Sequence, residues 1–239
     1  MQARRMIVFV LMLMLLMTGA AGARAEDDFA NTLKVYNKGI GGQNSRDGLR
    51  RFKKDVLALK PDFVLIYFGL NDTLNEPKFL DTDQYIANLE KMIDLARAAK
   101  ITPILATIHH IDAKALMTRH KKESYGEEGP QKKIDRYNAL LRQLADRKRV
   151  KLVPWCDIMD RAMAADPAIA YRNADGVHLN PPGSKLLAQS FYEAIAGDLR
   201  DGQTIVCLGD SVTFGARNQG AGTAEGTTYP ACLRRIELK

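Results

Sequence analysis

The chain has 239 residues, of which 46% are hydrophobic, and its formal net charge is +7. This length fits one domain with a full hydrophobic core and does not require a second. Three arginines of the N-terminal segment, Arg4, Arg5 and Arg24, supply part of the charge, and without them it is about +4. So mild an excess, with no nucleic-acid motif in the sequence, argues against a nucleic-acid partner.

The first predicted element is an export signal. Arg4 and Arg5 form a basic start, Met6–Met17 is continuously apolar, and Ala23-Arg24-Ala25 is a small-residue cleavage site. The apolar run is shorter than the roughly 20 residues that span a bilayer, so we expect cleavage rather than a retained membrane anchor. No cysteine lies near the cleavage site, which argues against a lipoprotein. Residues 1–25 are therefore predicted to be a signal peptide, which directs a mature domain of residues 26–239 to the periplasm or the exterior.

Short apolar runs alternate along the mature chain with segments of helical period. This pattern is typical of a parallel sheet covered by helices. The predicted strands are Leu33–Tyr36, Phe63–Phe68, Thr102–Thr107, Val150–Val153 and Thr204–Leu208. The predicted helices carry apolar stripes at Leu49 to Leu59, Ile86 to Ala96, Ile134 to Leu144 and Leu187 to Ile195, and a further helix begins near Tyr229.

Residues 109–130 form the longest stretch without clear periodicity, and loops of this length are often binding loops or lids. Within it, His109, His110 and Asp112 suggest a metal site, but their spacing fits no standard zinc pattern, so loop or pocket-wall positions are favoured. We expect no metal and no cofactor.

Two other residue types raise alternatives. Trp155 could stack on a sugar ring, although packing beside the sheet is favoured. Cys156, Cys207 and Cys232 are odd in number and imply no disulfide framework, yet one pair could form in an oxidising compartment.

Polar residues follow three of the predicted strands, where open α/β sheets bind their ligands. The first two groups are Asn37–Asn44, with several glycines, and Gly69-Leu70-Asn71-Asp72; the third is Gly209-Asp210-Ser211, and Asp175-Gly176-Val177-His178 precedes the last long helix. Each group alone is weak evidence, because Gly-Asp-Ser is often an ordinary turn. Their joint occurrence, each beside the element where its role would need it, favours a catalytic site.

These groups can be assembled into a serine mechanism. Ser211 needs a base to take its proton, and His178 can be that base, with Asp175 three residues earlier to orient the ring. Ester attack also needs donors for the developing oxyanion, which the backbone N–H groups of Ser211 and Gly42 and the side chain of Asn71 could supply. Glycine at position 42 lets the backbone approach a substrate closely.

The four groups resemble the sequence blocks of the SGNH, or GDSL, hydrolases. Gly209–Gly215 is similar to the family's first block, Asn37–Ser45 to the second, Gly69–Asp72 to the third and Asp175–His178 to the last. The resemblance covers nearly the whole mature chain. It implies a three-layer α/β/α, flavodoxin-like fold with a five-stranded parallel sheet, Ser211 as nucleophile with His178 and Asp175, and an oxyanion hole of Ser211, Gly42 and Asn71.

The order of the blocks departs from the family. Family members begin with the serine block, whereas here it comes last, at residues 204–215, which looks like a circular permutation. A truncated second domain, or a segment that completes a neighbouring chain by swapping, are the rival explanations. Single copies of each block favour one self-contained domain, for which a monomer is the expectation.

The sequence says little about the ester. The polar segment 109–130 favours an open polar cleft for short-chain or carbohydrate acetyl esters, and the small residues of Gly215–Thr228 are expected to wall the pocket. Acyl transfer to a sugar hydroxyl remains an alternative because the covalent intermediate is shared. A lysophospholipase or thioesterase is less favoured, and a non-catalytic carbohydrate-binding module least.

Overall fold

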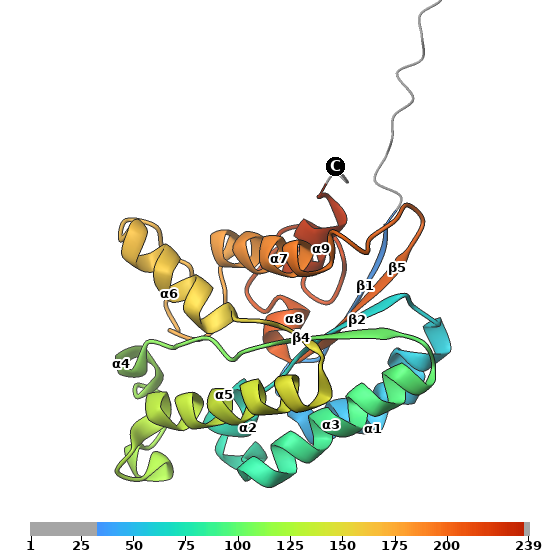
Figure 1. The fold of residues 1–239 in the computed structure, drawn as a ribbon. Coiled ribbons are helices and arrows are strands. Elements are labelled where there is room, and N and C mark those ends of the chain that lie inside the picture. Colours follow the sequence, from blue (N-terminus) through green and yellow to red (C-terminus); the bar gives the residue numbers. More distant parts are fainter. Residues whose placement is uncertain (1–32, 237–239) are drawn as a thin grey trace, which may run out of the picture. The chain divides into compact units, whose positions relative to one another are not determined.

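The centre of the fold is a parallel sheet of five strands in the order β1-β5-β2-β3-β4 (Figure 1). The computed structural model describes residues 33–236, so the predicted signal peptide lies outside the described residues. The strands are β1 (Lys34–Gly39), β2 (Phe63–Tyr67), β3 (Thr102–Ala106), β4 (Lys151–Val153) and β5 (Thr204–Gly209). All five predicted strands are confirmed, with their ends shifted by at most three residues.

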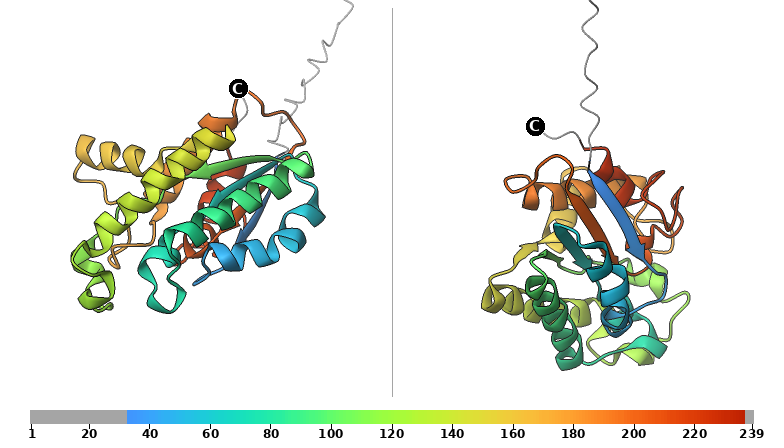
Figure 2. Two further views of the ribbon diagram at one scale, coloured as in Figure 1. Left: turned by 60° about the horizontal axis from the view of Figure 1, so that its bottom comes forward. Right: turned by 90° about the vertical axis from the view of Figure 1, so that its right-hand side faces the viewer.

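Strand β5 is last in the sequence but lies between β1 and β2, which precede it (Figure 2). Gly209 at its end pairs with Gly39 of β1 on one side and with Tyr67 of β2 on the other. The carboxyl ends of β1, β5 and β2 therefore lie side by side. The polar segments that follow them are brought together at the carboxyl edge of the sheet, as expected for an open parallel sheet.

Helices cover both faces of the sheet, which confirms the predicted three-layer α/β/α architecture. In Figure 1, α1, α3 and α5 lie on one face, and α6, α7 and α9 lie on the other. The helices are α1 (Ser45–Asp55), η1 (Leu57–Leu59), α2 (Leu70–Leu74), η2 (Glu76–Lys78), α3 (Thr82–Ala98), α4 (Ala113–Leu116), η3 (Lys122–Tyr125), α5 (Gly129–Lys148), α6 (Trp155–Ala165), α7 (Pro181–Ile195), α8 (Ser211–Phe214) and α9 (Tyr229–Arg234).

Side-chain caps determine where several helices begin. Asn44 and Asp47 form a capping box at the start of α1, in which each side chain accepts from the other's backbone N–H. Asn180 caps α7 through the backbone N–H of Gly183 and is followed by two prolines, which suit the first turn of a helix. The turn after β1 leads into α1, and the Asp175–His178 segment leads into α7. These caps therefore also fix the path of the chain in both segments, which lie at the carboxyl edge of the sheet.

The apolar stripes of the helices pack on the sheet in one continuous core. Strand β2 is buried along its whole length, as a central strand covered on both faces should be. Trp155 is fully buried at the start of α6, which confirms packing beside the sheet. No helix within residues 33–236 combines the length and the apolar character that crossing a membrane requires.

The segment 109–130 is more ordered than its sequence indicates. It contains α4 and η3, and it is anchored by buried Leu116 and by Tyr125, whose hydroxyl donates to the carbonyl of Leu74 at 2.7 Å. Each helix is only about one turn long, too short for apolar periodicity to reveal it. The segment is thereby attached to α2, the helix that carries Asn71.

Candidate active site

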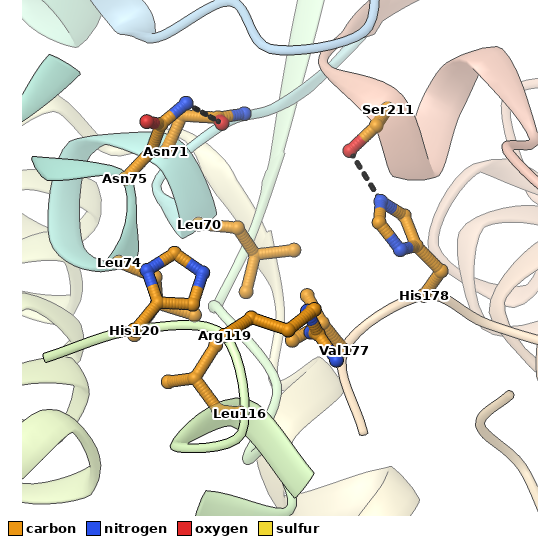
Figure 3. A pocket seen from close by; sticks show the side chains of 10 residues that line it. All are labelled: Leu70, Asn71, Leu74, Asn75, Leu116, Arg119, His120, Val177, His178 and Ser211. Carbon is orange, nitrogen blue, oxygen red and sulfur yellow. Dashed lines mark hydrogen bonds between the residues drawn. The ribbon is translucent and has the colours of Figure 1, made fainter. Parts of the chain in front are cut away.

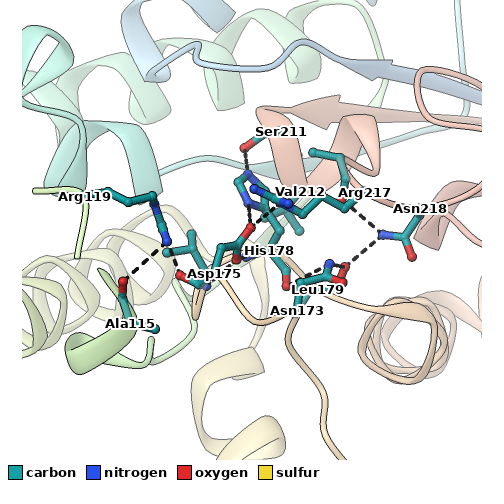
Figure 4. A network of polar contacts seen from close by, with 12 residues as sticks. Ala115, Arg119, Asn173, Asp175, His178, Leu179, Ser211, Val212, Arg217 and Asn218 are labelled. Atoms are coloured by element: carbon teal, nitrogen blue, oxygen red, sulfur yellow. Dashed lines mark hydrogen bonds and ion pairs between the residues drawn. The ribbon is translucent and has the colours of Figure 1, made fainter. Parts of the chain in front are cut away.

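Ser211, His178 and Asp175 form a hydrogen-bonded series at the carboxyl edge of the sheet (Figure 4). The Oγ of Ser211 lies 2.9 Å from Nε2 of His178, and Nδ1 of the same ring lies 2.8 Å from Oδ2 of Asp175. Ser211 is the first residue of α8, directly after β5, while the other two residues lie on the loop before α7. The structure thus joins residues that the sequence separates by 33 positions.

The Asp175 carboxylate is held in its ionised form. Burial raises its pKa, but hydrogen bonds from the backbone N–H groups of Val177 and His178, each 2.9 Å from Oδ1, and from the His178 ring outweigh it and lower the pKa to about 2. An ionised carboxylate can only accept, so Nδ1 of His178 carries the hydrogen of this contact. In the neutral ring, Nε2 is then free to accept the hydroxyl proton of Ser211.

Two further side chains connect the loop that carries Asp175 and His178, here called the histidine loop, to the segment Gly215–Thr228, which follows the serine helix (Figure 4). Arg217 places Nε 2.6 Å from Oδ2 of Asp175, and Asn218 donates from Nδ2 to the carbonyl of Leu179 at 2.8 Å. The expectation that Gly215–Thr228 walls the pocket is wrong: none of these residues lines the pocket beside Ser211. The side chains of Arg217 and Asn218 instead contact the histidine loop, so the segment stabilises that loop.

The proposed oxyanion donors lie around Ser211. An ideal Cβ on Gly41 would lie 4.0 Å from the Cβ of Ser211, which places the glycine-rich turn directly beside the serine. Gly42 has a φ of +73°, a conformation that favours glycine. Within residues 33–236, the backbone N–H groups of Gly42 and Ser211 have no hydrogen-bond acceptor, so both are available to a ligand.

Asn71 is fixed by two contacts. Its Nδ2 donates to the carbonyl of Gln43 at 3.0 Å, and its Oδ1 accepts from Nδ2 of Asn75 at 2.9 Å. The first contact determines which end of the amide is the nitrogen, because a backbone carbonyl can only accept. Gln43 accepts one of the two amide hydrogens, and the same side chain also hydrogen-bonds the buried Asp210 carboxyl group next to Ser211.

Two glycines allow the serine helix to lie close to the sheet. A Cβ on Gly39 would come within 2.0 Å of the backbone nitrogen of Phe214, and one on Gly209 within 2.1 Å of the Thr213 hydroxyl. Asp210 caps α8 by accepting from the backbone N–H of Val212 at 2.9 Å. Ser211 is therefore held at the first turn of a short helix that is packed against the ends of β1 and β5.

Two buried carboxyl groups lie behind the site. Burial raises the pKa of Asp210 to about 7 and that of Asp72 to about 6, although hydrogen bonds from Ser45 to Asp72 act in the opposite direction. Asp72 accepts from both the backbone N–H and the hydroxyl of Ser45, the latter at 2.6 Å. This contact links the third sequence block to the second and holds the glycine-rich turn beside α2.

A pocket of about 240 Å³ opens beside Ser211 (Figure 3). Its walls come from α2, from the 113–120 segment and from the histidine loop, and they combine apolar with polar side chains. The lining residues are Leu70, Asn71, Leu74, Asn75, Leu116, Arg119, His120, Val177, His178 and Ser211. The segment 109–130 reaches the pocket, as expected of a binding loop. Although the sequence of this segment is polar, part of the pocket wall is apolar.

The suggested metal-site residues do not come together. His109 is buried and contacts the Tyr67 hydroxyl and the Val177 carbonyl, while Asp112 caps α4. Burial lowers the pKa of His109 to about 3, so its ring is neutral. A different group has ligand atoms within 4.8 Å of one another, namely His110, Cys156 and Asp160, and the His110 nitrogens already contact Asp160 and Asp135.

The three cysteines are free thiols. Burial raises the pKa of both Cys156 and Cys207 to about 12, which disfavours the reactive thiolate. The disulfide left open by the sequence does not form among them.

Several residues that contact the site have no signal in the sequence. Arg119 donates to the backbone carbonyl of Asp175 at 2.8 Å, so arginines from two distant segments contact this one residue. His120 lines the pocket and contacts Glu76. Single charged residues in polar segments are common on any surface, and only the tertiary fold shows that these three, Arg119, Arg217 and His120, face the site.

A parallel sheet with a serine, a histidine and a carboxylate in series at its carboxyl edge is the arrangement that serine hydrolases of the α/β class use. The family model of the GDSL-like lipases and acylhydrolases matches residues 17–186, which is more than half of the sequence. The chain belongs to the GDSL-like Lipase/Acylhydrolase family and is a carboxylic ester hydrolase.

Two related sequences and two solved structures illustrate the likeness. An uncharacterized lipoprotein, YqeF, of Bacillus subtilis is 30% identical over 72% of this chain and 74% of its own. An acetylxylan esterase of Geobacillus stearothermophilus is 27% identical over 68% of this chain and 72% of its own. The crystal structure of an acetylxylan esterase from that organism, Axe2, superposes with a TM-score of 0.53 at 25% identity over 66% of this chain and 70% of Axe2. A GDSL-like lipase from Bacteroides thetaiotaomicron gives a TM-score of 0.54 at 26% identity, covering 68% of this chain and 75% of the lipase.

Proposed function

We propose that the protein is a secreted serine esterase that cleaves short-chain or carbohydrate acetyl esters through an acyl-enzyme on Ser211. The observation that carries the proposal is the series from Ser211 Oγ through the His178 ring to Asp175, with contacts of 2.9 and 2.8 Å, beside an accessible pocket. A serine is a weak nucleophile without a neighbouring base, and this series supplies one.

In the first half of the reaction, Ser211 Oγ attacks the ester carbonyl carbon while its proton moves to Nε2 of His178. Asp175 stabilises the imidazolium through the Nδ1 hydrogen. The carbonyl oxygen becomes an oxyanion that accepts from the backbone N–H groups of Gly42 and Ser211 and from the Asn71 amide. When the bond to the alcohol oxygen breaks, the imidazolium donates its proton to that oxygen, and the acyl group remains on Ser211.

In the second half, water takes the place of the alcohol. His178 accepts a proton from water, whose oxygen attacks the acyl carbon, and the same proton is then returned to Ser211 Oγ as the free acid leaves. A sugar hydroxyl in place of water would give acyl transfer with the same residues. Measuring free acid against acylated sugar, with an acyl donor and sugar acceptors both present, separates the two outcomes.

The acetyl-ester preference rests on the size of the pocket and on the relatives. A volume of about 240 Å³ accommodates a small ester, and one relative with 27% identity is named an acetylxylan esterase. Secretion is supported by the basic and apolar N-terminal sequence, and another relative is named a lipoprotein.

We further infer that the blocks are circularly permuted within one domain of residues 26–239. The family model ends at residue 186, after the second, third and last blocks and before the serine block. The position of β5 between β1 and β2 supports the same conclusion, because a central strand can be supplied from either end of a chain. Joining residue 239 to residue 28 and opening the chain at 200–203 should give an active monomer; a stable but inactive product would contradict the permutation.

The test of the proposed activity is a panel of acetyl, butyryl and long-acyl esters together with acetylated sugars, assayed on the wild type and on Ser211→Ala. We expect hydrolysis of acetyl esters by the wild type and its loss in the variant. Turnover of p-nitrophenyl acetate that survives Ser211→Ala would rule out the serine mechanism.

A further inference from the structure

We propose that His120, oriented by Glu76, is a specificity residue that hydrogen-bonds a hydroxyl group on the alcohol half of the ester. The inference rests on the proposed function and narrows its substrates to esters of sugars or similar polyols. Neither residue belongs to the four sequence blocks, and both come from segments that only the fold brings to the pocket.

His120 lies on the pocket wall opposite His178 (Figure 3). Its Nδ1 is 2.8 Å from Oε2 of Glu76 in η2, and the ring packs edge-on to Tyr125 with centroids 6.3 Å apart. Figure 3 shows the other ring nitrogen, Nε2, facing the interior of the pocket toward Leu70. Among the described residues Nε2 has no hydrogen-bond partner, so it is available to a molecule in the pocket.

The contact with Glu76 determines whether Nε2 of His120 can accept or donate a hydrogen bond. Although burial raises the pKa of Glu76, hydrogen bonds and the charge of the histidine lower it overall, so the carboxylate is ionised and accepts the Nδ1 hydrogen. In a neutral ring Nε2 is then an acceptor, and in a protonated ring it is a donor. A hydroxyl group satisfies either state, because it both donates and accepts, whereas a hydrocarbon satisfies neither.

The position of His178 indicates which half of the ester fills this pocket. The imidazolium must reach the leaving oxygen, so the group bonded to that oxygen lies against His178 and its neighbour Val177, which both line the pocket. Among the other lining residues, Leu70, Leu74 and Leu116 offer apolar contact to the carbon-bound hydrogens of a ring, whereas Asn71, Asn75 and Arg119 are polar. Polar groups beside an apolar surface suit a sugar better than a fatty alcohol.

The experiment compares two acetyl esters of the same six-membered ring. One is a monoacetate of methyl xyloside with free hydroxyls, and the other is tetrahydropyran-4-yl acetate, which has none. The quantity measured is the ratio of their kcat/KM values, in which effects on the shared acyl-enzyme chemistry cancel. We expect the wild type to favour the hydroxylated ester and His120→Phe to lower the ratio roughly tenfold, the loss of one hydrogen bond in a partly desolvated site.

His110→Phe is the matched control. Its imidazole contacts a carboxylate at the same 2.8 Å distance, to Asp135, but it does not line the pocket. This variant should keep the wild-type ratio. Glu76→Gln, which keeps the shape of the side chain and removes the charged partner, should lower the ratio about threefold and provides the test if His120→Phe fails to fold.

The outcomes separate the inference from the proposed function. A ratio that is unchanged in both His120→Phe and Glu76→Gln, or a wild type that cleaves the two esters equally well, overturns the inference and leaves the esterase standing. A wild type that hydrolyses neither ester nor p-nitrophenyl acetate overturns the proposed function and the inference with it.

Discussion

Arg217 Nε lies 2.6 Å from Oδ2 of Asp175, the same oxygen that lies 2.8 Å from Nδ1 of His178. One carboxylate oxygen therefore accepts from the imidazole and from a guanidinium at once. The arginine is mostly exposed, with 61% of its side chain accessible, whereas the aspartate side chain is only 5% accessible.

The exposure of Arg217 limits its contribution. An ion pair with one exposed partner is screened by water and is worth about 1 kcal/mol or less. We expect Arg217→Ala to reduce kcat/KM by less than about fivefold, with a difference from wild type that shrinks in high salt. Asp175→Asn should instead reduce kcat by about 10⁴-fold, because the amide no longer holds the correct histidine tautomer. Steady-state kinetics at two salt concentrations test both, and a loss above a hundredfold in Arg217→Ala would show that the arginine is required to position the ring.

The oxyanion assignment predicts unequal effects at two neighbouring asparagines. Asn71→Ala removes a donor to the oxyanion and should lower kcat by about 10² to 10³-fold. Asn75→Ala removes the contact that orients Asn71, at 2.9 Å, and a polar side chain of the pocket wall, but no donor to the oxyanion, so it should lower kcat by about tenfold or less. Equal losses of kcat in the two variants would contradict a direct role for Asn71 in binding the oxyanion.

Alanine substitutions at two glycines of similar conformation distinguish the effect of backbone strain on stability from the effect on catalysis. Gly42 and Gly202 have φ values of +73° and +78°, and a Cβ on either would have no neighbour within 4 Å. Alanine at either position should therefore lower the free energy of unfolding by a similar amount, about 1 kcal/mol. Only Gly42→Ala should lose esterase activity, since its N–H is an oxyanion donor. The check is thermal or urea unfolding beside kinetics, and full activity in Gly42→Ala would remove this residue from the oxyanion hole.

Stability should fall as the pH rises from about 4 to 7. The folded-state pKa values of Asp72, about 6, and Asp210, about 7, lie above the ordinary value of 3.8, so their contribution is complete below pH 3.8 and is lost as the pH rises through the folded pKa. His109 acts in the opposite sense over part of this range, because its pKa of about 3 lies below the ordinary 6.5, so it offsets part of the decline. Asp175 also acts in the opposite sense, at lower pH. Its pKa of about 2 gives stability that is present above pH 3.8 and lost as the pH falls toward 2.

Urea unfolding at several pH values measures this dependence. Each unit of pKa shift corresponds to about 1.4 kcal/mol, so the decline should be on the order of a few kcal/mol. Asp210→Asn should flatten it, because the amide does not titrate. The burial account of these pKa values is wrong if the wild type is more stable at pH 7 than at pH 4.5 and Asp210→Asn does not change that slope.

The sequence by itself determined the fold class and the positions of the strands. Apolar runs such as Phe63–Tyr67 are typical of central strands, and their alternation with helical stripes indicates a sheet covered on both faces. It also indicated which residues to combine at the site, because Ser211, His178 and Asn71 each lie in a turn directly beside a strand or a helix start. Local pattern was sufficient for these conclusions, since each element's periodicity and each turn's composition are set by near neighbours in the chain.

Only the tertiary structure decided what surrounds those residues. The segments containing Arg119, His120 and Arg217 carry ordinary surface charge in the sequence, and the pocket and network they form depend on where α4 and the 215–228 segment lie after folding. The same holds for the raised pKa values of Asp72 and Asp210, because burial is a property of packing and cannot be read from two aspartates in polar motifs. Contacts between residues far apart in sequence depend on how the whole chain folds, and no local sequence pattern encodes them.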